Sequence, residues 1–334
     1  MRRFTRFAAL AASLMLALAL QSRAQTLAPA FAQTLAQTWP QRAVRIILPL
    51  PPGAGADFAA RLFAERLSAR WGQPVIVENR QGADGIPAVA GFVAAHDNHT
   101  LLFSFGGVIT INPLLYDKLP YDPARDLVPI SPVTNTFLAI AATQSLQVDT
   151  IAGLMGAIRA QPGKLNWAAT PGLPLYAFDA LLKSNNLDMT QVAYRDFTPA
   201  LQDFGQGRIH VAATSIVPLL TQAKASNARV LAVLNRERFP MAPQVPTIRE
   251  AGHPELTLDA IVGVYGWRDI PTELKERISA DIRAVGADPD IGGKLIAGGS
   301  TVTTGTPTEF AAAIEEQRAK VATFAALIGP GFKP

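Results

Sequence analysis

Apolar and polar positions along the chain follow two periods, one typical of buried strands and one typical of helices. Val44–Leu50 is a nearly continuous apolar run, as expected for a strand buried on both faces. A turn rich in Pro and Gly follows at 51–57, and apolar residues then recur at helical spacing over Phe58–Trp71 before Gly72. A second short apolar run is Pro74–Val77. This order of strand, turn, helix and strand predicts a βαβ unit and a parallel sheet.

The same pattern recurs along the rest of the chain. Further strands are predicted at Thr100–Phe103, Leu165–Ala169, Gln191–Tyr194, 209–213 and Val230–Leu234. Helices are predicted after the turn Thr170–Pro174 to about Asn185, from a Thr198 N-cap onward, and over Glu273–Val285 and Glu309–Leu327. Strands that alternate with helices indicate an α/β fold.

The first 24 residues have the features of a secretory signal peptide. Three arginines in the first six residues precede an apolar run from Ala8 to Leu20, which is too short to span a bilayer. Residues 22–24 fit a cleavage site, with 30–32 as a second candidate. We expect residues 25–38 to be a flexible leader and the mature chain to lie outside the cytoplasmic membrane, without a membrane span. The alternative is an N-terminal anchor helix.

Charge and cysteine content exclude several classes of function. The 334 residues include 30 Lys and Arg and 26 Asp and Glu, for a formal net charge of +4. Four of the arginines and no acid lie in the first 24 residues, so the mature chain carries 26 charges of each sign. This balance argues against nucleic acid as a partner. The absence of Cys excludes disulfides, a Cys nucleophile, iron–sulfur clusters and Cys-type zinc sites.

The usual cofactor and nucleophile motifs are missing. There is no G-x-S-x-G elbow and no P-loop, and Phe58 stands where a dinucleotide fingerprint that begins at Gly53 needs its third Gly. His96–His99 could suggest a metal site, but no third ligand follows at a suitable spacing, and we interpret this segment as a solvated surface loop. We expect neither a metal nor a cofactor.

Small-residue turns lie at the carboxyl ends of predicted strands, where open α/β sheets bind ligands. They span 53–57, 170–174 and 195–198, and each precedes a predicted helix. A helix N-terminus offers free N–H groups and a partial positive charge, so two that face each other would hold a small carboxylate. The alternative is that these are ordinary turns in which Gly serves backbone geometry. Periodicity alone does not decide between the two.

Several ordered motifs are spread from about Trp39 to the C-terminus. In the most specific piece, Trp39–Arg80, the segment 44–80, VRIILPLPPGAGADFAARLFAERLSARWGQPVIVENR, parallels the patterns V-R-I-I-V-P-F-P-P-G-G-x-x-D-x-x-A-R and L-G-Q-P-V-V-V-E-N-R. Further matches are Asn112–Tyr116 to N-P-x-L-Y, Leu119–Pro123 to L-P-Y-D-P, Gln161–Leu165 to N-P-G-K-L and Val245–Gly252 to V-P-T-x-x-E-A-G. Together these motifs resemble those of the tripartite tricarboxylate transporter substrate-binding receptors, often called Bug proteins.

The resemblance implies a two-domain α/β periplasmic-binding-protein fold of type II, a Venus flytrap that closes about a hinge on a ligand in the interdomain cleft. It implies a discontinuous first domain, 39–136 plus 261–334, and a second domain, 137–260. Members bind small carboxylates, including di- and tricarboxylates, amino acids and aromatic acids, and deliver them to separate membrane transporter subunits.

The resemblance also implies a set of ligand-binding residues on both domains. In the first domain they follow the first and third strands, and in the second they occupy the corresponding places. The candidates are Pro52, Gly53, Ala54, Gly55, Asp57, Ser104, Gly106 and Gly107 in the first domain, and Thr170, Gly172, Leu173, Tyr194, Arg195, Asp196 and Thr214 in the second.

The second-domain candidates depart from the family pattern. The turn Thr170–Pro174 has one Gly where the family has two, and its two prolines lack N–H donors. Val192–Asp196 replaces the family's V-P-Y-K-G, which adds a carboxylate at Asp196. That carboxylate would repel an anionic ligand unless Arg195 neutralises it, or would receive the ammonium group of an amino acid. Alternatively, Asp196 caps the helix that begins near Thr198.

We therefore expect a monomeric periplasmic receptor that is not an enzyme. Its ligand is expected to be a small organic acid or amino acid, and its partners are expected to be separate membrane transporter subunits. Two alternatives stay open. One is a ligand-sensing module for a membrane signalling partner, and the other is a periplasmic enzyme on the same scaffold.

Overall fold

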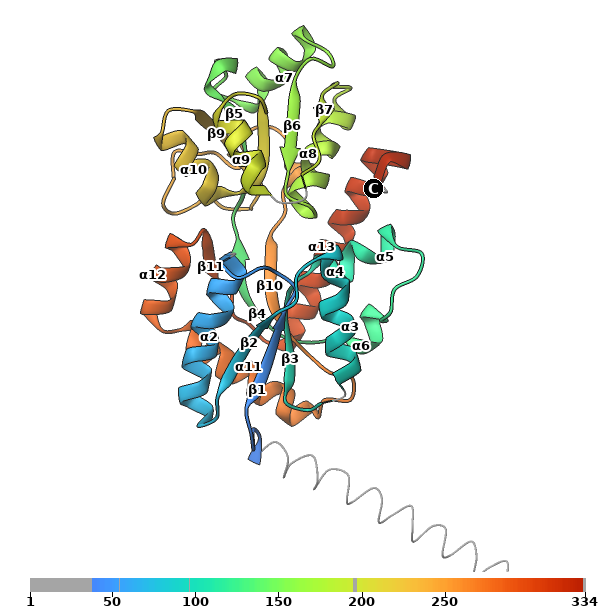
Figure 1. Ribbon diagram of the computed structural model, residues 1–334, viewed down its shortest axis with the longest axis vertical. Helices are drawn as coiled ribbons and strands as arrows, with labels where there is room; N and C mark the ends of the chain where they lie inside the picture. The colour runs from blue at the N-terminus through green and yellow to red at the C-terminus, as the bar shows by residue number, and fades with distance from the viewer. Residues whose placement is uncertain (1–37, 54, 96, 195–196, 333–334) are drawn as a thin grey trace, which may run out of the picture.

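The computed structural model describes residues 38–53, 55–95, 97–194 and 197–332. The predicted signal peptide, most of the predicted leader and the candidate residues Ala54, Arg195 and Asp196 lie outside these ranges. The described chain forms two α/β lobes, each built on one β-sheet, that lie one above the other in Figure 1. Within the described residues, no helix is long and apolar enough to cross a membrane.

Lobe 1 contains a six-stranded sheet in the order β11-β4-β10-β3-β1-β2. Its strands are β1 (Val44–Leu48), β2 (Val75–Asn79), β3 (Thr100–Phe105), β4 (Val128–Thr136), β10 (Ala260–Gly266) and β11 (Ser300–Val302). Its helices are α2 (Gly55–Trp71), α3 (Ile86–Ala95), α4 (Gly107–Thr110), α5 (Asn112–Leu115), α6 (Pro123–Asp126), α11 (Thr272–Gly286), α12 (Pro289–Ala297) and α13 (Pro307–Ile328), with 3-10 turns at η1 (Ala83–Gly85) and η4 (Gly329–Phe332).

Lobe 2 contains a five-stranded sheet in the order β7-β6-β8-β5-β9. Its strands are β5 (Leu138–Thr143), β6 (Asn166–Ala169), β7 (Thr190–Gln191), β8 (Val211–Ser215) and β9 (Ala228–Val233). Its helices are α7 (Ile151–Ala160), α8 (Leu173–Ser184), α9 (Phe197–Gly205) and α10 (Ile216–Lys224), with 3-10 turns at η2 (Gln144–Leu146) and η3 (Pro254–Leu256).

The direction of the strands places the carboxyl ends of both sheets opposite each other. β5 follows β4 through Phe137 and runs away from lobe 1, and β8 pairs with it antiparallel, so β8 and its parallel neighbour β6 run toward lobe 1. In the same way, β10 enters lobe 1 from lobe 2 and pairs antiparallel with β3, so β3 and β1 run toward lobe 2. The loops that follow these parallel strands therefore lie on the facing edges of the two lobes.

Alternation of side chains along β1 explains why helices cover both faces of the lobe 1 sheet. Val44, Ile46 and Leu48 pack with α2, α11 and α12, whereas Ile47 packs with α3 and the start of α13. Successive strand residues point to opposite faces, so a nearly continuous apolar run requires a helical layer on each side. This confirms that β1 is a strand buried on both faces.

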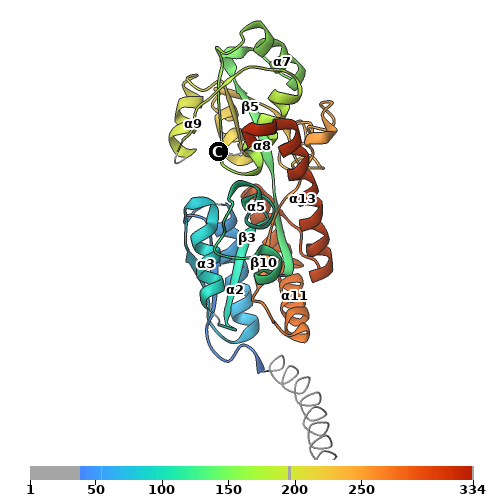
Figure 2. The same ribbon diagram turned by 90° about the vertical axis from the view of Figure 1, so that its right-hand side faces the viewer.

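The helix α13 packs into both lobes. Phe310 and Ile314 in its first half belong to the core of lobe 1, and Val321, Phe324 and Ile328 in its second half belong to the core of lobe 2. The helix runs along both lobes in the two views of Figures 1 and 2. A single helix thus connects the two cores on one side of the crossing strands.

The structure confirms the α/β fold class and the first βαβ unit, in which β1 and β2 are parallel. Both sheets are mixed, however, because each receives one antiparallel strand from the other lobe. The strand predicted at Gln191–Tyr194 is only the two residues of β7. Thr198 does not cap α9, because that helix begins one residue earlier, at Phe197.

Candidate functional site

The loop between β1 and α2 is held by the side chain of Asp57, which is 3% exposed. Its Oδ2 atom accepts hydrogen bonds from the N–H of Gly53 at 2.9 Å and from Nε of Arg61 at 3.0 Å. Its Oδ1 atom accepts one from Nδ2 of Asn79 at 2.8 Å, and the same amide donates to the carbonyl of Leu50 at 2.9 Å. Both ends of the loop are therefore tied to one carboxylate.

These donors keep Asp57 ionised. Burial alone would raise the pKa of its carboxyl, but the hydrogen bonds from Arg61, Gly53 and Asn79 outweigh burial and lower that pKa below its usual value. Pro52, Gly53 and Gly55 remain exposed on the loop, and Gly53 has a φ of +85°. A ligand at this loop would thus meet exposed backbone at the positive end of α2, whereas the Asp57 carboxylate already has protein partners.

The second group of lobe 1 candidates follows β3, the neighbour of β1. Ser104 is fully buried, and its Oγ donates to the carbonyl of Phe105 at 3.3 Å. Gly106 and Gly107 are also buried. A Cβ atom added to Gly106 would lie 1.8 Å from Oε1 of Gln317 on α13. Gly at position 106 therefore allows a side chain of α13 to reach the backbone of this loop.

The lobe 2 candidates follow β6 and its neighbour β8. The N–H of Thr170 donates to the carbonyl of Ala213 at 3.1 Å, which ties the turn to β8 beside the buried Thr214. Gly172, with a φ of +91°, precedes α8, and no side chain caps this helix. Leu173 is buried at the first position of the helix. The N-terminus of α8 thus follows a partly exposed Gly172 and has no side-chain cap.

Tyr194 uses its hydroxyl within lobe 2. The hydroxyl donates to Oδ2 of Asp203 on α9 at 2.6 Å, and Asp203 also pairs with Arg208 at 2.7 Å. Burial, together with the hydrogen bond to Asp203, raises the pKa of Tyr194 to about 12. Its two neighbours in the candidate set, Arg195 and Asp196, lie outside the described residues.

The loops chosen from the sequence lie at carboxyl ends of strands on facing edges of the lobes, but the residues that support these loops were not predicted. Arg61 and Asn79 both lie within the quoted motif 44–80, so their position there was an available signal. Gln317 carried no such signal, because only the fold brings α13 beside the loop after β3. The strained turn Gly82–Gly85 was also missed, although each of its four residues has a positive φ.

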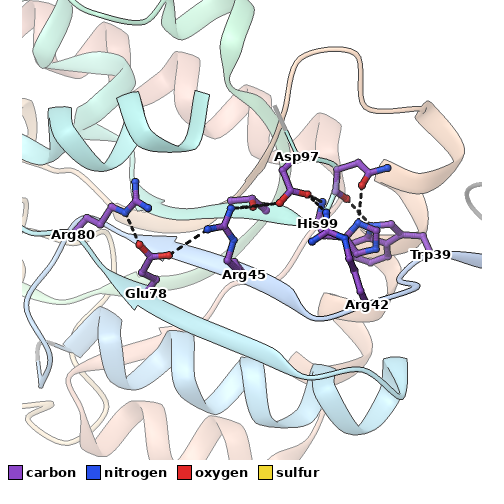
Figure 3. Close-up of polar contacts among 9 residues, drawn as sticks. Trp39, Arg42, Arg45, Glu78, Arg80, Asp97 and His99 are labelled. Atoms are coloured by element: carbon purple, nitrogen blue, oxygen red, sulfur yellow. Dashed lines mark hydrogen bonds and ion pairs between the residues drawn. The ribbon is translucent and has the colours of Figure 1, made fainter. Parts of the chain in front are cut away.

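A row of charged residues begins at the opposite end of lobe 1 with Arg42 and runs along the strands to Glu78 and Arg80, as Figure 3 shows. Asp97 pairs with Arg42 at 2.5 Å and with Arg45 at 3.4 Å, and Arg45 lies 3.8 Å from Glu78. His99 is 4% exposed and accepts a hydrogen bond from the N–H of Gln41 at 3.1 Å. The interpretation of 96–99 as a solvated loop is therefore wrong for Asp97 and His99, which anchor the entry into β1.

A cavity of about 590 Å³ lies next to this row. It is lined in part by Arg42, Asp97, Trp267 and Arg268. These residues precede β1 and β3 or follow β10, so the cavity lies away from the carboxyl ends of the parallel strands. Among the residues that the structure describes, no three His, Cys, Asp or Glu side chains are placed to hold a metal ion.

Two α/β lobes joined by crossing strands, with helix-starting loops on their facing edges, define a two-lobed binding protein of the periplasmic-binding-protein fold. The sequence profile of one such family, described as the tripartite tricarboxylate transporter family receptor, matches residues 59–329. The chain belongs to this family.

Individual relatives agree with this assignment. A UPF0065 protein of Bordetella bronchiseptica is 32% identical over 287 residues, which are 85% of this chain and 84% of that protein. BugT of Bordetella pertussis is 31% identical over 224 residues, which are 66% of this chain and 69% of that protein. The solved structure of R. palustris Rpa4515 with adipate superimposes with a TM-score of 0.78 and 27% identity, covering 87% of this chain and 98% of that one. The expected family and fold are confirmed.

Proposed function

We propose that this protein is a periplasmic receptor that captures one small carboxylate-bearing solute between its lobes and presents it to a membrane transporter. The observation that carries the proposal is the opposition of two helix-starting loops, Pro52–Asp57 and Thr170–Leu173, on facing edges of the lobes. Each offers backbone groups at the positive end of a helix, which favours an anion.

The first step of capture would be binding to lobe 1. Exposed Gly53 allows a carboxylate to approach the backbone closely, and Asp57 holds the loop in one shape before the ligand arrives. A loop that is already ordered loses less conformational entropy when it binds. Closure would then bring Gly172 and the N-terminus of α8 onto the other end of the ligand.

We propose two domains, the first comprising 39–136 plus 261–334 and the second 137–260. These bounds are supported by the two places where the chain crosses between the sheets, at Phe137 and again between β9 and β10. The second half of α13 belongs to the first segment by sequence yet packs in the core of lobe 2. Closure must therefore be accommodated by the crossing strands and by α13 together.

The ligand class follows from chemistry and likeness together. The related Rpa4515 has adipate in its structure, and the two helix starts here suit a ligand with a carboxylate. Export is supported by the signal-peptide features of the first 24 residues. A transport role, rather than turnover of the ligand, is supported by membership of a family of transporter receptors.

A thermal-shift screen of protein purified from the periplasm tests the proposal. The panel contains adipate, malate, citrate, benzoate and the common amino acids. A ligand at 100 times its Kd stabilises the folded state by about 2.7 kcal/mol, which raises Tm by several degrees. At least one acid of the panel is expected to produce this shift. A flat response to every compound at millimolar concentration would overturn the proposal.

A further inference from the structure

Gln317 lies on α13 at the point where the helix passes from one lobe to the other. The preceding buried apolar residue of the helix, Ile314, packs in the core of lobe 1, and the next buried one, Val321, packs in the core of lobe 2. Gln317 is only 8% exposed although its side chain is an amide. A buried amide without hydrogen-bond partners is costly. The groups around Gln317 are therefore the partners on which its burial depends.

One end of this amide contacts the loop after β3. Oε1 of Gln317 lies so close to Gly106 that a Cβ there would come within 1.8 Å of it. The hydroxyl of Thr110 donates its one hydrogen to the carbonyl of Gly106 at 3.1 Å and shares it with Oε1 of Gln317 at 3.5 Å. Gly106 and its neighbour Gly107 belong to the candidate ligand wall of lobe 1.

The other end contacts the strands that cross between the lobes. Nε2 of Gln317 donates to the carbonyl of Asp259 at 3.5 Å. The carboxylate of Asp259 in turn accepts from Nδ2 of Asn135 at 2.8 Å and pairs with Arg236 at 3.0 Å. Asn135 accepts from Nδ2 of Asn235, at 3.0 Å. Asn135 and Asp259 stand at the two crossings, so the amide connects the candidate ligand wall to the hinge.

We propose that Gln317 is a positioning residue that sets the loop after β3 according to the degree of lobe closure. The inference rests on the proposed function. If lobe 2 rotates, the second half of α13 and the crossing strands shift relative to lobe 1, and the Gln317 amide shifts with them. The hydrogen bonds of the Gln317 amide to Thr110 and to the carbonyl of Asp259 are both 3.5 Å long, near the limit for a hydrogen bond. A small rotation of lobe 2 therefore strengthens or breaks them.

The test compares Gln317→Met with Glu315→Gln. Met keeps the length of the side chain but removes both polar ends, and Glu315 is an exposed residue of the same helix that pairs with Arg318. Adipate, malate and glutamate are titrated by calorimetry, and the tightest binder of the wild type is used throughout. We expect Gln317→Met to bind this probe roughly 3- to 30-fold more weakly, with Tm of the ligand-free protein little changed. Glu315→Gln is expected to bind as the wild type does.

A double-mutant cycle with Gly106→Ala provides the second, independent variant. The added methyl group displaces Oε1 of Gln317, so this substitution is expected to weaken binding through the same contact. In the double variant Gly106→Ala/Gln317→Met, the loss of binding free energy is then expected to be smaller than the sum of the losses in the two single variants. Additive losses overturn the inference, as does wild-type affinity in Gln317→Met. If the wild type binds no probe, the proposed function fails; if it binds and the variants match it, only the role of Gln317 fails.

Discussion

The N–H of Gly53 donates a hydrogen bond to Oδ2 of Asp57 at 2.9 Å, so the carboxylate in the first turn of α2 closes the loop that precedes it. Oδ2 also accepts a hydrogen bond from Nε of Arg61, and Oδ1 of Asp57 accepts one from Nδ2 of Asn79. The acidic residue at this place therefore organises the loop, while Pro52, Gly53 and Gly55 stay exposed on it.

Replacement of Asp57 is expected to destabilise the protein. Asp57→Ala leaves the Gly53 N–H without its acceptor and removes one of the acceptors of the Asn79 amide and of the Arg61 guanidinium, and we expect the free energy of unfolding to fall by about 2–4 kcal/mol. The half-exposed Arg61 can turn to water, which limits the loss. Asp290→Ala, at an exposed acid in the first turn of α12, is expected to cost less than about 1 kcal/mol in urea unfolding. Equal effects of the two substitutions would contradict the role of Asp57.

A second prediction concerns the backbone conformation of Gly53. Its φ of +85° is unfavourable for any residue with a Cβ atom, although no atom lies within 4 Å of the place where one would be added. Gly53→Ala is therefore expected to lower the free energy of unfolding by about 1 kcal/mol through backbone strain alone. Gly292→Ala, which has equally open surroundings but lies within α12, is expected to stabilise by about 0.5–1 kcal/mol. Chemical unfolding measures the change in the free energy of unfolding of each variant. Changes of the same sign in both variants would refute the prediction.

The hinge contains a fully bonded amide at Asn235, which is 1% exposed. Its Oδ1 accepts from the N–H of Leu138 at 2.9 Å, and its Nδ2 donates to Asn135 and to the carbonyl of Thr136. Asn235→Asp replaces that donor by an oxygen facing two acceptors. We expect a loss of about 2–4 kcal/mol at pH 7 that becomes smaller as the new carboxyl is protonated at lower pH. A loss that does not depend on pH would show that repulsion at this amide is not the cause.

Acidification is expected to weaken the anchor of the N-terminal segment at His99. Burial, aided by Arg42 and opposed by Asp97, lowers the pKa of His99 below its usual value of 6.5. The unfolded chain then binds more protons than the folded one just below pH 6.5, so this stabilisation is complete above that pH and is lost as the pH falls. Unfolding of the wild type and His99→Gln between pH 8 and 5 measures it. The stability difference between them should shrink toward pH 5, and a constant or growing difference would contradict the assignment.

The sequence predicted the lobe 1 elements around the first motif well, because one short stretch contains both the strand alternation and the helix period. Val44–Leu48 and Gly55–Trp71 lie within a few residues of their predicted bounds. The pairing of the crossing strands was not predicted, since β10 pairs with residues more than 120 positions away in the chain, such as Thr136 and Ser104. Local periodicity carries no information about such pairing.

In the candidate site, too, local features were predicted from the sequence and long-range contacts were not. The places of the loops followed from the rule that ligands bind at carboxyl strand ends, but what each side chain contacts did not. Tyr194 bonds to Asp203, nine residues further on, and Gly106 lies beneath Gln317, more than 200 residues away in sequence. Whether these candidates touch a ligand stays a prediction.

The most direct test of the central claim is calorimetric titration of periplasm-purified protein with the acid that gives the largest thermal shift. We predict one binding site per chain and a Kd in the micromolar range or tighter, which needs about 8 kcal/mol from a few charge-assisted hydrogen bonds. We also predict that Gly53→Ala weakens this affinity more than Gly292→Ala does. A site that binds equally well in both variants, or a stoichiometry other than one, would contradict capture of a single solute at the facing loops.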